Sequence, residues 1–373
     1  MHQVIIIGGG LAGLTSAIHL SKKGLDVLLF EKNEFPKHKV CGEYISNEVL
    51  PYLHYLDFDP FKHGAVNIER LTFSTASSKT LSAKLPLGGF GISRHCIDKA
   101  LANKAMLNGV TIIQGVVTDI HFESDAFTIT TNSSDTYEAK IVIGAFGKRS
   151  NMDVNLKRSF MKESAPYLAV KAHYQGNFPD DLVCLHNFEG GYCGLSKVES
   201  DRINVCYITD YKSFKRYKNI AEFEKYVISK NKHLKKAFSS MTPMFEKPLT
   251  ISQISFSTKK NVDEHVIMCG DSAGLIHPLA GNGMSMAIRS AYMASDLIYQ
   301  YFQGHIKSRE NLEKQYSQMW KAEFQSRLAT GHLIARLFKI GILTEAFVAL
   351  TKLFPIIMPN IIKMTHGKPM NIR

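Results

Sequence analysis

The sequence has no hydrophobic run long enough to cross a membrane. A spanning helix needs about 20 predominantly apolar residues, and no window of this chain reaches that apolar length. The apolar run at Val4–Ile7 is too short for a signal peptide, is followed at once by glycines, and lacks a preceding basic segment. We therefore expect a cytoplasmic protein.

The chain also lacks the residue patterns of metal and nucleic-acid sites. Its six cysteines are scattered, with no CxxC pair and no Cys/His cluster at zinc spacing, which predicts free thiols and no metal. The net charge is +12, but the lysines and arginines form no basic run interleaved with aromatic residues, so we expect no nucleic-acid partner. An anionic cofactor, an anionic substrate or a membrane surface would account for the excess equally well.

The order of apolar and polar segments predicts an α/β protein. Val4–Ile7 reads as a buried strand of a parallel sheet, residues 11–24 as a helix that ends at a glycine, and Asp26–Glu31 as the next strand. Further along we expect the following elements: a strand at 71–74, a helix at 93–109, strands over 111–147, short antiparallel strands over 165–210, helical sequence over 213–240, a strand at 266–269, helices from 283 and over 309–329, and an apolar segment over 331–363 broken by Pro355 and Pro359.

The first motif is a glycine pattern between a strand and a helix. Gly8, Gly10 and Gly13 have the GxGxxG spacing of dinucleotide-binding turns, and Glu31 ends the second strand. Such glycines permit a tight turn, approach of backbone to a pyrophosphate, and close packing of helix on strand, while the acid binds the adenosine ribose. With Leu11 and Ala12 between them, these residues form the first predicted cofactor-binding set.

The second motif is GDSAGLIHPLAGNG, residues 270–283, which follows an apolar strand. Asp271 next to Gly270 can accept hydrogen bonds from a polyol chain. The residues from Gly281 through Asn282 and Gly283 to Met284 place backbone N–H groups at the start of the next helix. This arrangement suits the ribityl chain and the pyrimidine edge of a flavin. The alternative is a loop that only satisfies the helix terminus.

Four segments together resemble the flavoproteins of the para-hydroxybenzoate hydroxylase-like fold, nearest to the branch with the geranylgeranyl reductases. These segments are VIIIGGGLAGLTSAIHL with Glu31, KHKVCGEYIS, SRHCIDKAL, and GDSAGLIHPLAGNGMSMAIRSA, and they span residues 4–291. The resemblance implies that FAD is the cofactor. It also implies that Lys32 lies beside the ribose or adenine, Arg94 near the pyrophosphate or ribityl chain, Val117 at the adenine, and Cys41 with Gly42 near the flavin ring.

The resemblance implies the fold class and the domains. We expect a Rossmann-like FAD-binding domain, discontinuous over residues 1–50, 90–160 and 260–305. A mainly antiparallel β-sheet substrate domain is inserted at 51–89 and 161–259, and a helical segment follows at 306–373.

The expected function is that of an FAD-dependent oxidoreductase, with a monooxygenase that oxidises an aromatic or lipophilic substrate through reduced flavin and O2 as the first hypothesis. NADH, NADPH, a flavin reductase or another electron donor would supply the electrons. The alternatives are a flavin-dependent reductase of a prenyl or polyene double bond, and a non-enzymatic flavin-binding or maturation partner. Phe146–Gly147 stands where the hydroxylases carry an Asp-Gly pair, which motivates the last hypothesis.

Two residues are candidates for a part in the chemistry. His277 lies in the flavin motif and could donate a proton or polarise the substrate. Cys41 is either a redox or proton-delivering thiol or a small residue packed beside the cofactor, and packing is the favoured reading. The apolar segment from Leu333, which carries several lysines, covers the protein core, lies on a membrane surface, or walls a channel for a lipophilic substrate, and core cover is the favoured reading.

Overall fold

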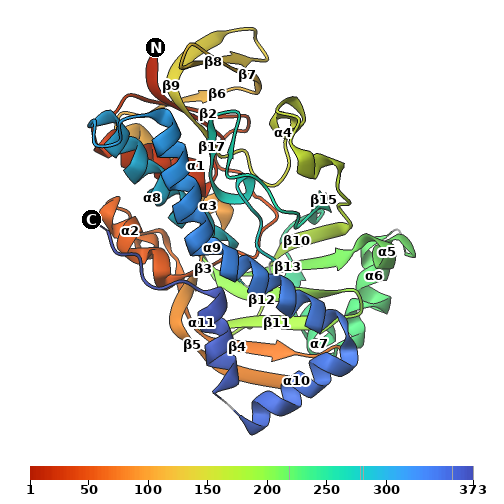
Figure 1. The fold of residues 1–373 in the computed structure, drawn as a ribbon. Helices are drawn as coiled ribbons and strands as arrows, with labels where there is room; N and C mark the ends of the chain where they lie inside the picture. The colour runs from red at the N-terminus through yellow and green to blue at the C-terminus, as the bar shows by residue number, and fades with distance from the viewer. Residues whose placement is uncertain (218, 278, 280, 355, 373) are drawn as a thin grey trace.

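The computed structural model describes residues 1–217, 219–277, 279, 281–354 and 356–372, and these form two sheets with helices around them (Figure 1). Within these residues, the first sheet has eight strands. They are β1 (His2–Ile7), β2 (Val27–Glu31), β6 (Thr111–Gln114), β7 (Val117–Glu123), β8 (Ala126–Thr131), β9 (Thr136–Gly144), β16 (Val262–Asp263) and β17 (Val266–Met268). Strands β17, β9, β1, β2 and β6 run parallel in that order, while β7 and β8 add an antiparallel ribbon to β9.

The second sheet is mainly antiparallel and has nine strands within the described residues. They are β3 (Tyr44–Ser46), β4 (Val66–Ser74), β5 (Thr80–Gly91), β10 (Tyr167–Gln175), β11 (Leu182–Phe188), β12 (Gly191–Val198), β13 (Arg202–Asp210), β14 (Thr242–Pro243) and β15 (Leu249–Ile254). The one parallel pairing on the main path joins β11 to β4. The predicted α/β fold class, with an antiparallel sheet inserted into a Rossmann-like unit, is confirmed.

The helices fill the space around the sheets. They are α1 (Leu11–Lys22), α2 (Leu50–Tyr55), α3 (Arg94–Leu107), α4 (Asn151–Asn155), α5 (Tyr211–Lys215), α6 (Ile220–Tyr226), α7 (Lys232–Ser240), α8 (Gly283–Phe302), α9 (Arg309–Lys339), α10 (Gly341–Leu353) and α11 (Ile357–Thr365). Helices α1 and α8 pack together beside the first sheet, and α9 runs from there diagonally to the second sheet (Figure 1).

Alternating side chains give the second sheet two buried faces. On β10, Leu168 and Val170 belong to a core cluster with Phe223 of α6 and Leu234 of α7. The intervening Ala169 belongs to a different cluster on the opposite face. Because successive side chains of a strand point to opposite faces, one face packs on helices and the other is free to line a cavity.

Three sequence predictions differ from the structure. The helix expected over 309–329 continues to Lys339, and the strand expected at 71–74 begins at Val66. The helical stretch at 213–240 is divided into α5, α6 and α7, because the side chains of Asn219 and Asn231 accept hydrogen bonds from backbone N–H groups and start new helices. Pro355, expected to break the C-terminal apolar segment, lies outside the described residues. The domain boundaries stay a prediction.

No single helix among the described residues is long and apolar enough to span a bilayer. Helices α10 and α11 reach that length and composition only together, and the chain bends by 116° between them.

The glycine turn after β1 places α1 directly against the first sheet. Gly8 has a φ of +113°, and a Cβ built on Gly13 would lie 1.9 Å from the carbonyl oxygen of Gly8. Real Cβ atoms do not approach backbone oxygen so closely, so the start of α1 can sit against the turn only because residue 13 has no side chain.

We therefore expect Gly13→Ala to lower the free energy of unfolding of the cofactor-free protein by about 1–3 kcal/mol, the usual cost of overpacking. The measurement is urea unfolding followed by circular dichroism. Gly341→Ala is the matched control, because a Cβ there meets no atom of the residues that the structure describes within 4 Å. Equal stability of the two variants would contradict the packing argument.

Candidate functional site

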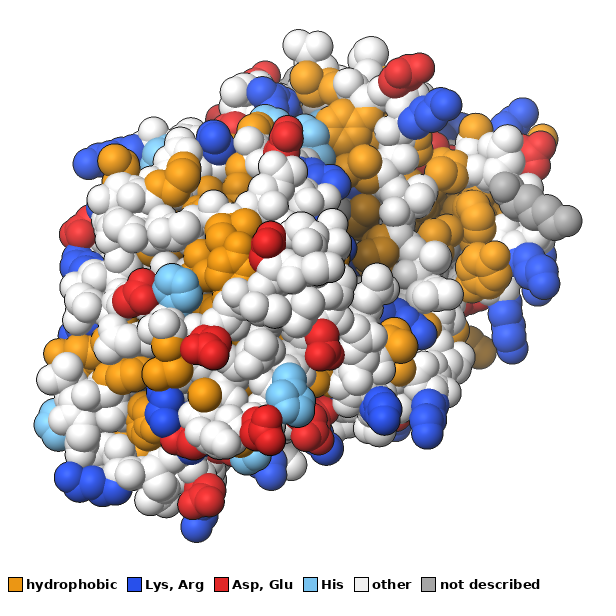
Figure 2. All heavy atoms as spheres, turned by 90° about the horizontal axis from the view of Figure 1, so that it is seen from above, with side chains coloured by type: hydrophobic (Ala, Val, Ile, Leu, Met, Phe, Trp, Pro, Cys, Tyr) orange, Lys and Arg blue, Asp and Glu red, His pale blue; other side chains and the backbone are white. Residues whose placement is uncertain are grey.

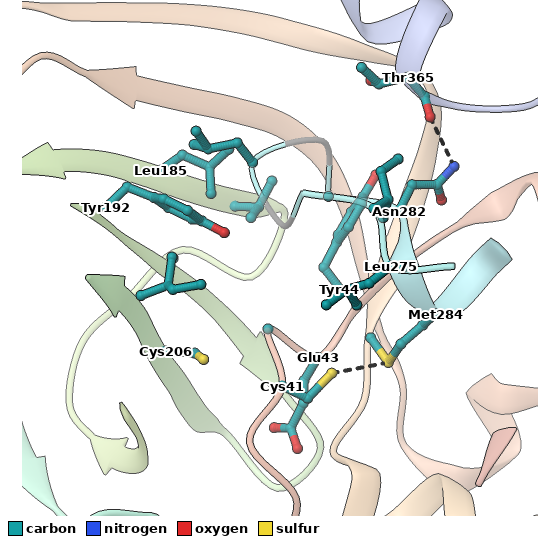
Figure 3. A pocket seen from close by; sticks show the side chains of 18 of the residues that line it. Cys41, Glu43, Tyr44, Leu185, Tyr192, Cys206, Leu275, Asn282, Met284 and Thr365 are labelled. Atoms are coloured by element: carbon teal, nitrogen blue, oxygen red, sulfur yellow. Dashed lines mark hydrogen bonds between the residues drawn. The ribbon is translucent and has the colours of Figure 1, made fainter. Parts of the chain in front are cut away.

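A cavity of about 330 Å³ lies where the loops of the first sheet meet the second sheet. Its lining is mostly apolar and comes from loops, from the second sheet and from helices. The loops are those after β1, β2, β9 and β17, and the second sheet contributes the inner face of β3–β5, β10–β13 and β15. The helices contribute the starts of α3 and α8 and the sides of α9, α10 and α11. In Figure 3, Tyr192 and Cys206 of the second sheet face Tyr44, Cys41 and Met284 across this space. One cavity thus joins the two predicted motifs to the C-terminal helices.

Two helix N-termini open into this cavity. Helix α1 begins after Gly10 and helix α8 after Asn282, and in neither does the residue before the helix cap it with a side-chain hydrogen bond. Backbone N–H groups in the first turn of a helix have no partner within the helix, and the helix dipole makes that end partly positive. Both ends are therefore suited to bind anionic or electron-rich groups of one elongated ligand.

The loop after β17 brings the predicted acid to the same cavity. Gly270 has a φ of +62°, and a Cβ on it would approach the Cβ atoms of Ala12 and Ala287 to 3.2 and 3.3 Å. The next residue, Asp271, lines the cavity together with Arg94. The absence of a side chain at Gly270 allows this loop to pack against the first turn of α1.

The structure gathers twelve of the predicted site residues around the cavity. They are Gly10, Leu11, Ala12, Cys41, Gly42, Arg94, Gly270, Asp271, Gly281, Asn282, Gly283 and Met284. These residues come from segments more than 200 positions apart, and their convergence is what one dinucleotide-sized cofactor requires.

The remaining predicted cofactor residues lie outside the lining of this cavity. The Glu31 carboxylate accepts hydrogen bonds from Gly9 N–H at 2.7 Å and from Asn33, so it holds the glycine turn in place. Lys32 is exposed, and Val117 is buried at the start of β7, where it pairs with Thr131 of β8. Gly8 and Gly13 shape the turn. The roles predicted for these residues toward the ADP half stay predictions.

These features fit FAD. The uncapped start of α1 with Arg94 beside Gly10 would bind the pyrophosphate, and a Cβ on Gly10 would come within 3.5 Å of the Arg94 guanidinium. Asp271 would accept from the ribityl hydroxyls, and the start of α8 would face the pyrimidine edge of the ring. Gly42 leaves open space, since no atom of the described part of the chain lies within 4 Å of a Cβ built there.

Cys41 is part of the wall and is held by its neighbours. Its Sγ lies 3.5 Å from the Sδ of Met284, and its carbonyl oxygen accepts from the Asn204 amide at 3.2 Å. Figure 3 shows the two sulfur atoms facing each other. This arrangement agrees with the packing interpretation, and a redox or proton-delivering role for Cys41 stays a prediction.

His277 lies behind the lining rather than in it. Its ring packs against Phe256 with centroids 4.6 Å apart, and it also contacts the rings of Tyr167 and Tyr192. Burial lowers the pKa of His277 to about 3, helped by the charges of His332 and Lys339. The imidazole is therefore neutral at physiological pH, which does not favour the proton donation proposed for it from the sequence.

A buried charged cluster next to the cavity escaped the sequence analysis. The Glu43 carboxylate accepts from Lys171 at 2.5 Å, from the Arg94 backbone N–H at 2.8 Å, and contacts His173 Nε2 at 2.7 Å. Burial alone would raise the pKa of Glu43, but the hydrogen bond from His173 and the charge of Lys171 hold it below its usual value. The one sequence feature that could have indicated this cluster is the pair Lys171 and His173 on one strand, since residues two apart on a strand share a face.

Comparisons with known proteins agree with this geometry. Residues 3–40 match the family described as FAD dependent oxidoreductase, and residues 202–340 match the squalene epoxidase family. The digeranylgeranylglycerophospholipid reductase of Methanosarcina acetivorans is 24% identical over 347 residues, 89% of this chain and 82% of the relative.

Solved structures share the fold. A flavin-dependent brominase aligns with a TM-score of 0.81 at 19% identity, over 98% of this chain and 93% of its own. A geranylgeranyl bacteriochlorophyll reductase-like protein from Thermoplasma acidophilum aligns with a TM-score of 0.74 at 19% identity, over 91% of this chain and 88% of its own. The expected resemblance to FAD-dependent oxidoreductases is therefore confirmed, and the descriptions of the first matched family and of the brominase name FAD and flavin, respectively.

The predicted binding of FAD by the loop after β17 and by the start of α8 can be tested with variants that should still fold. Among the described residues, a Cβ on Gly283 would meet only Ile276, at an ordinary 3.7 Å, so Gly283→Val should fold. We expect Gly283→Val and Asp271→Ala to reduce the FAD content of the purified protein at least about tenfold, the effect of about 1.4 kcal/mol in binding. The measurement is the flavin absorbance per chain together with the melting temperature of the cofactor-free protein. Normal flavin content in both variants would mean that the motif is misassigned.

A pH dependence follows from Lys259, whose Nζ donates to the carbonyl oxygens of Lys148 and Asp271 at 2.6 and 2.8 Å. Burial lowers the pKa of Lys259 from 10.5 to about 8. Between pH 8 and pH 10 the unfolded chain therefore binds more protons at this residue than the folded chain, so the contribution of Lys259 to stability rises with pH.

We expect this contribution to rise by about 2 kcal/mol between pH 8 and pH 10. The measurement is the free energy of unfolding at both pH values for the cofactor-free protein and for Lys259→Met. The expected result is a smaller rise in the variant, whatever its absolute stability. An identical pH dependence would show that Lys259 titrates at an ordinary value.

Proposed function

We propose that this FAD-dependent oxidoreductase is a monooxygenase that inserts oxygen into a lipophilic substrate with reduced flavin and O2. The observation that carries the proposal is the continuous apolar lining from the start of α8 to α9, α10 and α11. A small polar substrate would leave most of that lining in contact with water, whereas an elongated apolar molecule would cover it.

The apolar part of the cavity is suited to a long hydrocarbon chain. Leu71 and Phe73 of β4 line it together with Phe338, Phe347 and Ile362 of the C-terminal helices, and the rings of Phe73 and Phe338 stack with centroids 4.7 Å apart. The match to the squalene epoxidase family supports both the substrate class and the insertion of oxygen. It covers residues 202–340, which include β13, the loop after β17 and α9.

When bound, FAD would supply the electrons and activate O2 for transfer of one oxygen atom to the substrate. The protein would exclude water from that reaction and hold protons at two phenols. Burial raises the pKa of both Tyr44 and Tyr192 above the usual range, so their hydroxyls remain protonated hydrogen-bond donors. Figure 3 shows the hydroxyl of Tyr192 directed into the cavity, where it could orient the polar end of a substrate.

A second candidate is reduction of a carbon–carbon double bond with the same reduced flavin. It is supported by the similarity to digeranylgeranylglycerophospholipid reductases over most of the chain, and it needs the same apolar cavity. In this reaction the substrate gains two hydrogen atoms, and no oxygen is consumed.

Of the expected sources of electrons, which are NADH, NADPH and a separate flavin reductase, we propose the separate reductase. Phe146–Gly147 replaces the Asp-Gly pair of the hydroxylases, and Gly147 is tied to Ser272, whose Oγ accepts from its N–H at 2.9 Å. This difference supports a separate reductase, and bleaching of the bound flavin by NADH or NADPH alone would contradict that choice.

The two reactions can be separated with a polyprenyl alcohol as probe. Chemically reduced holoenzyme is mixed with it under ¹⁸O₂ and, in parallel, without oxygen, and the products are analysed by mass spectrometry. We expect a product with one ¹⁸O atom only in the first mixture. A product with two additional hydrogens in the anaerobic mixture would overturn oxygenation in favour of reduction. Turnover of either kind counts against a non-enzymatic flavin-binding partner.

A further inference from the structure

The C-terminal helices expose an unusual amount of apolar surface. Among the described residues, nine of 19 exposed large apolar side chains fall between positions 333 and 364. They are Leu333, Ile340, Ile342, Leu343, Leu350, Leu353, Phe354, Ile356 and Met364, and we call them the C-terminal apolar surface. Exposed apolar side chains are normal when scattered singly, but such a concentration marks an interaction site.

The same helices are apolar on their inner side. Thr344, Val348 and Thr351 of α10 and Met358 and Ile362 of α11 are buried, at intervals of three to four residues along each helix. Phe347, Met358 and Ile362 also line the cavity. Packing of the core thus accounts for one side of α10 and α11 and leaves the opposite side without an explanation. In Figure 1 these helices form the corner of the molecule farthest from the first sheet.

The charges around the C-terminal apolar surface are almost all positive. Between positions 333 and 364 the cations are Arg336, Lys339, Lys352 and Lys363, and all four are exposed. The single acid in this range, Glu345, is already paired with Lys79 at 3.0 Å and accepts a hydrogen bond from Ser77. On the face seen in Figure 2, by contrast, acidic and basic side chains are mixed. A partner of this surface should therefore be both apolar and negatively charged.

We propose that the C-terminal apolar surface docks on an anionic lipid bilayer, with α10 and α11 lying in the interface plane. Apolar side chains would enter the acyl region while the flanking lysines and arginine contact anionic headgroups, as in interfacial amphipathic helices. A bilayer fits better than a protein partner, because one surface offers both an apolar layer and diffuse negative charge.

Docking at this place would also bring the membrane next to the cavity. Phe347 and Met358, on the docked helices, form part of the cavity wall, so a lipophilic substrate could pass from the bilayer into the cavity without crossing water. This consequence rests on the proposed function, whereas docking itself does not.

The test is sedimentation of the flavin-loaded full chain with vesicles, without any substrate. We expect binding to vesicles of phosphatidylcholine with phosphatidylglycerol, weaker binding to phosphatidylcholine alone, and weaker binding at higher salt because salt screens the headgroup charge. A chain that stays in the supernatant with both vesicle types would overturn docking. Because no turnover is measured, this outcome is independent of the reaction the enzyme catalyses.

Matched variants identify the surface. Ile342 is 82% exposed on α10 and Leu107 is 84% exposed on α3, so either can change to Asp without disturbing the core. We expect Ile342→Asp to weaken vesicle binding at least about tenfold, since it replaces an apolar side chain in the acyl region with a charged one, and Leu107→Asp to leave binding unchanged. Equal effects would overturn the assignment.

A second pair of variants tests the charges. Lys352→Gln with Lys363→Gln should weaken binding to the anionic vesicles, and Lys314→Gln with Lys321→Gln, on the first half of α9, should not. Size-exclusion chromatography with light scattering tests the competing occupant, a second copy of the chain. A dimer that Ile342→Asp abolishes would assign the surface to self-association and overturn membrane docking.

Discussion

The arrangement of the two sheets depends on one buried carboxylate, that of Glu43. Glu43 follows Cys41 and Gly42 in the loop before β3, and its carboxylate contacts Lys171 and His173 of β10 and the first backbone N–H of α3. The side chains of Glu43, Lys171 and His173 are fully buried or nearly so. Removal of one partner from such a cluster lowers the free energy of unfolding by about 3–5 kcal/mol, because the other charge stays buried. Glu43 thereby fixes the Cys41 turn, the start of α3 and the second sheet relative to one another.

The placement of the two sheets by Glu43 determines which groups face the cavity, and therefore which ligands and reactions the cavity can support. The first sheet contributes backbone N–H groups at two helix starts and the Asp271 carboxylate, which are suited to the polar atoms of a dinucleotide. The second sheet and the C-terminal helices contribute almost no charge. A reactive ring held between them would face polar groups on one side and an apolar, water-poor space on the other, where electrostatic interactions are strong.

The sequence predicted the cofactor half of the site far better than the rest. Gly8, Gly10 and Gly13 meet a backbone requirement that has a fixed spacing, and Gly270 and Asp271 come directly after a recognisable strand. The local sequence pattern is therefore enough to predict this half of the site. The Glu43–Lys171 pair joins residues 128 positions apart, and only tertiary packing brings them together. The wall that includes Phe347 and Ile362 was one of the alternatives that the sequence left open, because the apolar pattern of α10 and α11 is equally that of a core helix.

The C-terminal helices show why apolar periodicity alone is ambiguous. A helix that buries one face normally exposes polar residues on the other, yet α10 buries Val348 and exposes Ile342 and Leu353. Exposure of these side chains to water is unfavourable for the isolated chain, and the cost is offset only where another apolar phase covers them. The cavity wall and the exposed surface are therefore two sides of the same helices. A substitution on the exposed face can therefore also affect the cavity, and one in the cavity wall can affect the exposed face, since both faces belong to α10 and α11.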